Sequence, residues 1–231
     1  IQLKTILLAA GFGTRLRPIT DTIPKCLVPI KGKPILQIWL DLLTKAGLSN
    51  FLINTHYLSE NVVSFIQNCP QKNLCKVKYE KELLGTAGTL LSNIDYLENE
   101  DCLLIHADNY CLADISEFIQ AHQNRPKKCL MTMLTFITDK PSTCGIVEID
   151  NNNIVVEFYE KISNPPGNLA NGAVYILSAE LIKILKIKFK NAIDFSNEII
   201  PLFKNKIFTY ETKEIFIDIG TVENYLSAQV I

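Results

Sequence analysis

The spacing of apolar residues in the first half of the chain predicts alternating strands and helices. Short apolar runs suited to buried strands are followed by segments whose apolar residues recur at helical spacing. We expect strands at 5–9, 51–53, 77–79 and 102–106, and helices over 34–47, from 59 and from 85. This alternation is typical of a Rossmann-like α/β fold, a mostly parallel central sheet with helices on both faces.

The second half of the chain has a different pattern. It predicts strands at 131–136, 146–149, 155–159, 173–177 and 215–217, and helices at 179–185 and 195–203. Three consecutive asparagines at 151–153 mark a turn between two of these strands. Because no segment looks like a linker, we expect a single domain over 1–231 with a small β-rich accessory portion.

Composition narrows the class of protein. The 231 residues are 48% hydrophobic and 20% charged, as in an ordered globular chain. A net charge of −1 argues against a nucleic-acid or membrane-surface partner. The seven cysteines are irregularly spaced, so we expect reduced thiols and a cytoplasmic location. The chain begins with Ile1 rather than Met, and we expect it to be cut from something longer.

A glycine-rich loop follows the first predicted strand, and it reads Ala-Ala-Gly-Phe-Gly-Thr-Arg-Leu-Arg-Pro over 9–18. Two glycines let backbone amides approach an anion, and Arg15 can bind a phosphate through two donors at once. The pattern therefore predicts a polyphosphate site. Its expected contacts are Ala9, Ala10, Gly11, Gly13, Thr14 and Arg15.

Two common phosphate loops do not fit this segment. A Walker A loop ends in Gly-Lys-Ser or Gly-Lys-Thr, whereas this loop ends in Leu16-Arg17-Pro18. A dinucleotide fingerprint needs a third glycine, where Leu16 stands, and an acidic residue about 20 positions later. The alternative without a binding function is a solvated glycine turn with surface arginines.

Two aspartates follow predicted strands. Asp108 comes after 102–106, and Asp218 comes after 215–217. A carboxylate at the end of a buried strand is costly unless it is paired or bound to a cation. Two such carboxylates brought together would suit Mg²⁺, which takes a few carboxylate oxygens together with substrate phosphates. An ordinary strand-end cap is the alternative for Asp108 alone.

Together these segments resemble the sugar-1-phosphate nucleotidyltransferases. The glycine loop, Pro24-Lys25, Gly32-Lys33-Pro34 and Asp218-Ile219-Gly220-Thr221 match motifs of that family, whereas His106-Ala107-Asp108 departs from its usual triplet. The resemblance implies transfer of a nucleoside monophosphate from a nucleoside triphosphate to a sugar-1-phosphate. It implies catalytic roles for Arg15, Lys25, Asp108 and Asp218, with Mg²⁺ on the two aspartates.

The segment 80–88, Glu-Lys-Glu-Leu-Leu-Gly-Thr-Ala-Gly, is most similar to mannose- and heptose-1-phosphate guanylyltransferases. That resemblance implies GTP as substrate and a GDP-sugar as product. It places four residues at the base: Glu80, Gly85, Thr86 and Ala87. A thymidylyl- or uridylyltransferase of the same family is the alternative, and Glu80 could also be a solvated strand end.

Three further stretches resemble the family's sugar site. The implied sugar-phosphate contacts are Gly145, Glu160, Lys161 and Asn171. Singly, Glu160 and Lys161 could be no more than an exposed charge pair. We expect Trp39 to be a core residue, and neither His56 nor His122 has the spacing of a metal ligand.

Two other functions stay open at this level. A catalytically silent nucleotide-sugar-binding regulatory subunit would be expected to lack Lys25, Asp108 or Asp218, and all three are present. An alcohol-phosphate transferase would need an aromatic or acidic cage, which the sequence does not display. The sequence does not fix the oligomeric state, and a homodimer is one option.

Overall fold

The computed structural model describes residues 3–231, which form two compact units built from separated stretches of the chain. We name the first the glycine-loop unit; it consists of Lys4–Leu83, Ile105–Ile115 and Glu214–Ile231. We name the second the antiparallel unit; it consists of Leu84–Leu104 and Ser116–Lys213, together with Leu3.

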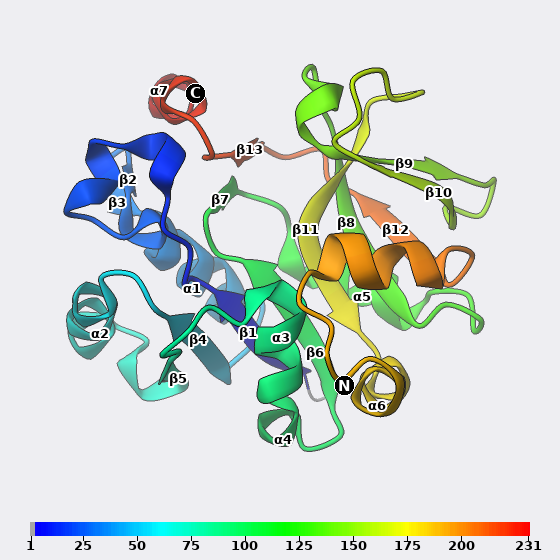
Figure 1. Ribbon diagram of the computed structural model, residues 1–231, viewed down its shortest axis with the longest axis horizontal. Helices are drawn as coiled ribbons and strands as arrows, with labels where there is room; N and C mark the ends of the chain where they lie inside the picture. The colour runs from blue at the N-terminus through cyan, green and yellow to red at the C-terminus, as the bar shows by residue number, and fades with distance from the viewer. Residues whose placement is uncertain (1–2) are drawn as a thin grey trace. The chain divides into compact units, whose positions relative to one another are not determined.

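Three parallel strands organise the glycine-loop unit (Figure 1). They are β1 (Leu3–Leu8), β4 (Phe51–Thr55) and β5 (Cys75–Tyr79), with β4 paired to both of the others. Two small antiparallel pairs join β2 (Pro29–Ile30) to β3 (Lys33–Pro34) and β7 (Asn109–Cys111) to β13 (Phe216–Asp218). Because the three strands are parallel, their carboxyl ends lie at one edge, where open α/β sheets bind ligands.

The helices of this unit are α1 (Ile35–Lys45), α2 (Ser59–Asn68) and α7 (Val222–Val230). Helix α1 shows why the sequence predicted it. Its buried side chains fall on one face: Ile35, Leu36, Trp39, Leu40 and Leu43. Gly47, at φ +81°, ends the helix, and the Leu48 N–H donates to the carbonyl of Leu43 at 3.0 Å. Burial of each large apolar side chain contributes about 1.5–3 kcal/mol.

The antiparallel unit is built on β11 (Leu169–Leu177), which pairs antiparallel with β8 (Met131–Ile137) and with β9 (Gly145–Ile149). Strand β10 (Val155–Glu160) pairs with β9, and β12 (Ile207–Glu211) runs parallel to β8. The helices are α3 (Gly85–Ser92), α4 (Ile94–Leu97), α5 (Ile115–Gln123) and α6 (Ala179–Lys188). Strand β6 (Asp101–His106) contributes its first four residues to this unit and its last two to the other.

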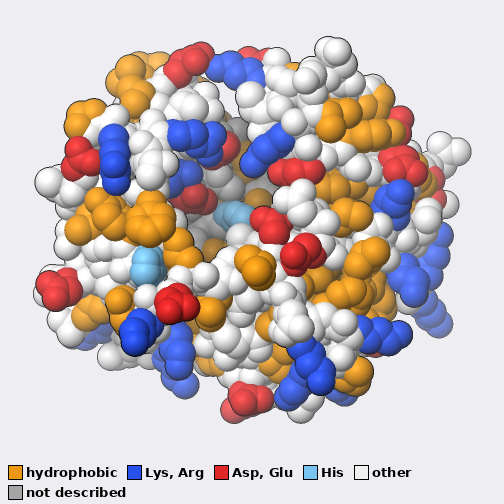
Figure 2. All heavy atoms as spheres, viewed as in Figure 1, with side chains coloured by type: hydrophobic (Ala, Val, Ile, Leu, Met, Phe, Trp, Pro, Cys, Tyr) orange, Lys and Arg blue, Asp and Glu red, His pale blue; other side chains and the backbone are white. Residues whose placement is uncertain are grey.

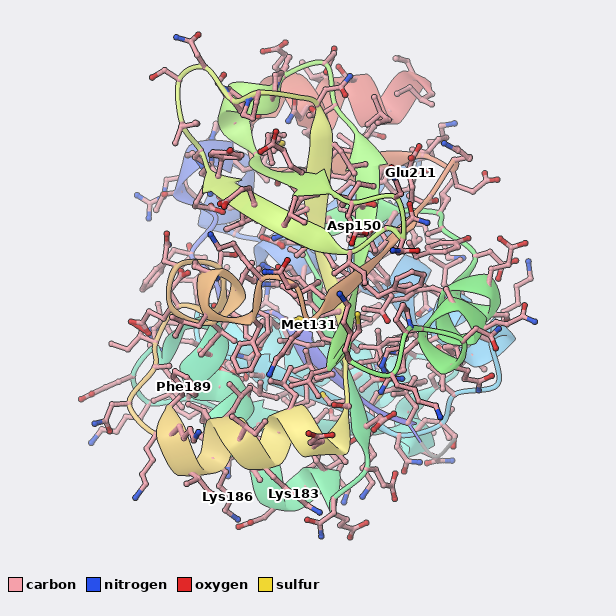
Figure 3. The ribbon with its side chains drawn as sticks, turned by 90° about the vertical axis from the view of Figure 1, so that its right-hand side faces the viewer. Met131, Asp150, Lys183, Lys186, Phe189 and Glu211 are labelled. Atoms are coloured by element: carbon pink, nitrogen blue, oxygen red, sulfur yellow. The ribbon has the colours of Figure 1, made fainter. Side chains whose placement is uncertain are left out.

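Helix α6 is amphipathic. Its N-terminus is capped by Ser178, whose hydroxyl accepts from the Leu181 N–H at 3.2 Å. Leu181 and Leu185 are buried, whereas Lys183 and Lys186 point outward on the other side of the helix (Figure 3). The sequence predicted a helix over 179–185, and the helix in the structure continues to Lys188.

The structure confirms the predicted α/β fold, with a mostly parallel central sheet, surrounding helices and smaller antiparallel pairs. The helix expected at 195–203 is wrong as a single element. It is a π-turn at Phe195–Ile199 followed by a 3₁₀ turn at Ile200–Phe203. Pro201 lacks the N–H that a continuous α-helix would use. The sequence also missed α5, α7 and β12.

Two other sequence predictions can be compared with the structure. All seven cysteines are free thiols, as expected. Trp39 is fully buried, and its indole N–H donates to the carbonyl of Asn109 at 2.9 Å. Within residues 3–231, no helix combines the length and the apolar character needed to cross a membrane.

Candidate active site

The loop after β1 folds tightly around Gly13. The carbonyl of Gly13 accepts from the Leu16 N–H at 2.9 Å and from the Thr20 hydroxyl at 2.7 Å. Gly13 has φ +64°, and a Cβ there would lie 2.9 Å from Cγ2 of Thr20 and 3.2 Å from Cβ of Lys25. Any other residue would be strained and would push Lys25 away.

The other loop residues divide between support and contact. Ala9 and Ala10 are buried, whereas Gly11, Thr14 and Arg15 are exposed. Nothing lies within 4 Å of the position where a Cβ on Gly11 would stand, so its backbone is open to a ligand. In the view of Figure 2, hydrophobic side chains surround one of the histidines, toward the left of the molecule. In the glycine-loop unit, the ring of Phe12 contacts the rings of His56 and Tyr57, with centroids 5.4 and 5.6 Å apart.

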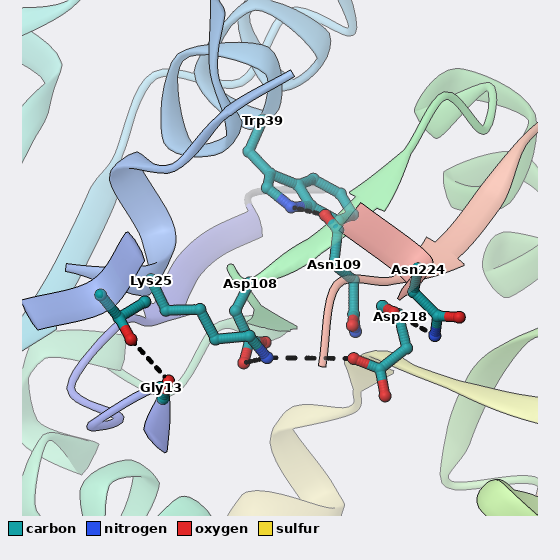
Figure 4. Close-up of polar contacts among 8 residues, drawn as sticks. Gly13, Lys25, Trp39, Asp108, Asn109, Asp218 and Asn224 are labelled. Carbon is teal, nitrogen blue, oxygen red and sulfur yellow. Dashed lines mark hydrogen bonds and ion pairs between the residues drawn. The ribbon is translucent and has the colours of Figure 1, made fainter. Parts of the chain in front are cut away.

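Lys25 joins the two aspartates that sequence analysis singled out (Figure 4). Its ammonium nitrogen lies 2.6 Å from Oδ2 of Asp108 and 3.9 Å from Oδ1 of Asp218. The Lys25 side chain is only 10% exposed, whereas the two carboxylates are 32% and 45% exposed. One buried ammonium is therefore shared by two carboxylates that keep access to solvent.

Strand pairing explains why residues so far apart in the sequence meet. Asp108 directly precedes β7, and Asp218 is the last residue of β13, where it stands opposite Asn109. The Asn224 amide of α7 donates to the Asp218 carbonyl at 2.8 Å, which holds the end of β13. Thr221 caps the same helix through the Asn224 N–H at 3.2 Å.

Arg15 lies beside the same group. A Cβ added to Gly220 would stand 3.0 Å from Nη2 of Arg15 and 3.1 Å from each carboxylate oxygen of Asp218. Gly220 thus leaves room for both charged side chains. Within residues 3–231 Arg15 forms no ion pair, so its guanidinium can accept an anionic ligand.

The electrostatics favour an ionised Asp108. Burial works to raise the pKa of this carboxyl group, but the positive charges of Lys25 and, to a smaller extent, His106 hold its pKa below the ordinary value. An ionised carboxylate is the form that binds a cation.

The donor set suits a magnesium ion. Asp108 and Asp218 supply carboxylate oxygens, and the described part of the chain contains no group of three or more His, Cys, Asp or Glu side chains that could hold a metal ion. Magnesium commonly binds through one or two carboxylates and completes its coordination with water and phosphate. A pair of aspartates beside a phosphate loop fits that requirement.

The predicted base-contacting residues fall into two sets. Glu80, in the glycine-loop unit, is 5% exposed, and its Oε1 accepts from the Asn54 amide at 3.0 Å. In the antiparallel unit, Gly85 begins α3 at φ +77°, and a Cβ there would lie 2.4 Å from the Ile193 carbonyl. The Ala87 N–H donates to that carbonyl at 2.9 Å, and the Phe195 N–H donates to the Thr86 hydroxyl at 2.8 Å.

Asn54 is a residue that sequence reasoning passed over. It belongs to β4, and its role depends on contacts with Ala9 and Glu80, which lie far away in sequence. The available signal was a buried amide next to the carboxyl end of an apolar strand.

The predicted sugar-phosphate residues gather in the antiparallel unit. Gly145 stands opposite Glu160 in the β9–β10 pair, and a Cβ on Gly145 would lie 2.7 Å from Oε2 of Glu160. Lys161 lies 3.5 Å from Oε1 of Glu160. Burial raises the pKa of Glu160 even though the Lys161 charge opposes it. These three residues form one polar group.

Asn171 is held by its own strand. Its amide nitrogen donates to the Tyr175 hydroxyl at 2.7 Å, and its amide oxygen accepts from the Ala173 N–H at 2.9 Å. These bonds bridge a β-bulge in β11 that lies between Asn171 and Tyr175. Asn171 therefore presents a fixed amide, which retains one N–H and one lone pair for a ligand.

A comparison with known protein families identifies the family of this chain. The chain belongs to the nucleotidyl transferase family, which it matches over residues 4–231.

Sequence identity to the individual relatives is low. The mannose-1-phosphate guanyltransferase of Saccharomyces cerevisiae is 27% identical over 99% of this chain and 64% of its own length. The chain thus spans a little under two thirds of the curated relatives that it matches.

Two solved structures are also similar. HddC from Yersinia pseudotuberculosis complexed with GMP-PN has a TM-score of 0.81 at 28% identity, covering 98% of this chain and 97% of HddC. A candidate glucose-1-phosphate thymidylyltransferase from Bacillus anthracis has a TM-score of 0.87 at 23% identity, covering 98% and 94%. The second likeness shows the fold alone.

Proposed function

We propose that this chain transfers a guanylyl group from GTP to a sugar-1-phosphate, giving a GDP-sugar and pyrophosphate. The observation that carries the proposal is the Lys25 ammonium held by Asp108 and Asp218 beside the glycine loop. Phosphoryl transfer needs charge neutralisation and alignment more than covalent help from the protein. A shared ammonium, an open arginine and accessible backbone amides supply both.

In the reaction, a phosphate oxygen of the sugar-1-phosphate attacks the α-phosphorus of GTP. The bond from that phosphorus to the oxygen bridging to the β-phosphate breaks, and pyrophosphate leaves with the electron pair. The attacking oxygen is already anionic, so no residue has to remove a proton from it. Arg15 and the amides near Gly11 and Gly13 bind the departing phosphates, and Lys25 stabilises charge at the α-phosphate.

Asp108 and Asp218 are the residues that would hold Mg²⁺, which when bound neutralises charge on the substrate phosphates. Their accessible carboxylates support this assignment.

Glu80 is the proposed reader of the base. Guanine presents the N1–H and N2–H donors on its pairing edge, and a carboxylate is acceptor-only. The names of the guanyltransferase relatives and the GMP-PN bound to HddC favour GTP. Mannose and heptose phosphates are the proposed sugars, bound through Glu160, Lys161 and Asn171. Gly85, Thr86 and Ala87 are proposed to lie at the base.

We propose that residues 1–231 work as one nucleotidyltransferase domain. A cytoplasmic location and a homodimer remain predictions from the sequence.

The decisive test is a matrix of four nucleoside triphosphates against several sugar-1-phosphates, with pyrophosphate release measured with and without Mg²⁺. We expect release only in the GTP column and only with metal. Release with UTP or dTTP instead would contradict the base assignment. If no pair of substrates gives pyrophosphate release, while the folded protein still binds a triphosphate, the regulatory-subunit alternative would be favoured.

A further inference from the structure

We infer that Asn54 is a positioning residue that fixes which hydrogen-bonding atom of residue 80 faces the nucleotide base. The inference rests on the proposed function, because it assumes that Glu80 reads the base. It concerns the residue that orients the Glu80 side chain toward the base. The amide of Asn54 is tied on one side to the glycine loop and on the other to Glu80.

The parallel strands bring these groups together. In the pairing of β1 with β4, Asn54 stands opposite Leu8, and Ala9 is the next residue along. In the pairing of β4 with β5, Thr55 stands opposite Tyr79, and the Glu80 N–H continues the ladder by donating to the Thr55 carbonyl at 2.8 Å. One side chain at the middle strand can therefore reach the ends of both neighbours.

The amide has a defined orientation. Oδ1 of Asn54 accepts from the Ala9 N–H at 2.7 Å, and a backbone N–H can only donate. That bond puts the oxygen on the Ala9 side and the NH₂ group on the other. Nδ2 then donates to Oε1 of Glu80 at 3.0 Å. Both side chains are almost fully buried, so a reversed amide would leave buried groups mismatched, which costs about 1–3 kcal/mol each.

The orientation determines what residue 80 can offer. Because Asn54 presents a donor, residue 80 must turn an oxygen toward it. With glutamate, the second atom of the carboxylate is also an oxygen, so a base that donates is selected. With glutamine, the second atom would be the NH₂ group, so a base that accepts would be selected. The hydrogen bond from the Ala9 N–H fixes the orientation of the Asn54 amide, and that orientation determines which atom residue 80 presents to the base.

The test compares GTP and UTP affinity by calorimetry, without sugar phosphate, in four proteins: the parent, Glu80→Gln, Asn54→Asp, and the double variant. Glu80→Gln should lose at least about tenfold of the GTP preference, because it presents a donor to guanine. In the double variant, Asp at 54 still accepts from Ala9 but needs a donor from Gln at 80. The glutamine then turns its oxygen to the base, and we expect several-fold recovery of the GTP preference relative to Glu80→Gln.

Asn54→Asp alone sets two carboxylates against each other and should weaken GTP binding more than UTP binding. Should that variant fail to fold, the comparison of Glu80→Gln with the double variant still decides, since the double variant has the parent's charge. Thermal unfolding of each protein provides the folding control.

Recovery of the preference in the double variant supports the relay, since a merely structural asparagine would not restore it. Equal GTP:UTP ratios in Glu80→Gln and the double variant would overturn it. A parent protein with no GTP preference would overturn it as well. Pyrophosphate release, measured separately with sugar-1-phosphates, tells whether the proposed reaction stands in either case.

Discussion

The two polar groups of this molecule hold their charges in different ways. In the glycine-loop unit, the buried Lys25 ammonium is shared by Asp108 and Asp218, so each charge depends on another charge. In the antiparallel unit, Lys161 is exposed and lies 3.5 Å from Glu160. The Glu160 carboxylate occupies space that a side chain at position 145 would need, and Gly145 has no side chain. The first group is organised by electrostatic compensation and the second by shape. Substitutions of charge and of volume should therefore affect the two groups differently.

The largest expected effect is on the shared ammonium. Asp108→Asn removes the closer carboxylate and should lower kcat about 10²–10³-fold, the scale on which preorganised electrostatic groups act. Asp41→Asn is the matched control, because Lys33 and the amides of Gln37 and Gln71 hold that carboxylate without Lys25. Steady-state pyrophosphate release checks both. A comparable fall in kcat for Asp41→Asn would contradict a specific role for Asp108.

A smaller effect should follow from Lys161→Ala in the second group. The exposed ammonium is proposed to contact the sugar phosphate, so its loss should raise KM for the sugar-1-phosphate about tenfold and leave KM for GTP unchanged. Lys204→Ala removes a lysine that pairs with Glu157 at 2.8 Å in the same unit and should change neither constant. An increase confined to the GTP constant would remove Lys161 from the sugar site.

Volume rather than charge is tested at Gly145. The added methyl of Gly145→Ala would stand 2.7 Å from Oε2 of Glu160 and 2.8 Å from the Phe158 ring, so Glu160 must move. We expect a several-fold higher KM for the sugar-1-phosphate and a loss of about 1–3 kcal/mol in the free energy of unfolding. Gly167→Ala, with open space around its Cα, should be neutral in kinetics and in urea unfolding. Equal effects of the two variants would argue against shape as the organising feature.

The smallest expected effect is on stability in acid, where the two groups should respond with opposite signs. Burial opposes ionisation of Asp108, but Lys25 holds its pKa below 3.8, so its contribution to stability is present above pH 3.8 and lost as pH falls further. Burial raises the pKa of Glu160 above 4.5, so its contribution is present below pH 4.5 and lost as pH rises through that raised pKa.

Urea unfolding of Asp108→Asn and Glu160→Gln across about pH 3 to 7 separates the two contributions. Asp108→Asn should alter the profile only in its most acidic part. Glu160→Gln should alter it just above pH 4.5. Profiles that change in the same region, or with the same sign, would show that the two carboxyl groups are not held differently.

Local patterns predicted the parts of the fold that local physics determines. Helix α1 was predictable because apolar residues recur on one face and Gly47 ends the helix. Helix α7 was missed because Ala228 is its only buried residue, so it carries little apolar periodicity. The helix expected at 195–203 changes type, and Asp194 caps the first part by accepting from the Asn197 N–H at 2.7 Å.

In the candidate site, too, local motifs did not predict the contacts that depend on tertiary structure. Motifs predicted that Asp108 and Asp218 would lie together, and the structure places both carboxylates near the Lys25 ammonium. Asn54 could not be found in this way, because its partners Ala9 and Glu80 belong to other strands and only the register of the parallel pairs brings them into contact. Asn171 was predicted as a sugar contact without its bond to Tyr175, which depends on a bulge that the sequence does not reveal.

Trp39 is an intrinsic fluorescence probe for the site. The chain has one tryptophan, and its indole is bonded to the carbonyl of Asn109, the residue after Asp108. Emission from a buried indole is sensitive to the electric field around it, so a cation or polyphosphate arriving at the carboxylate pair should shift the fluorescence. Titrations of metal and nucleotide can then be followed in the unmodified protein, with no label and no coupled assay.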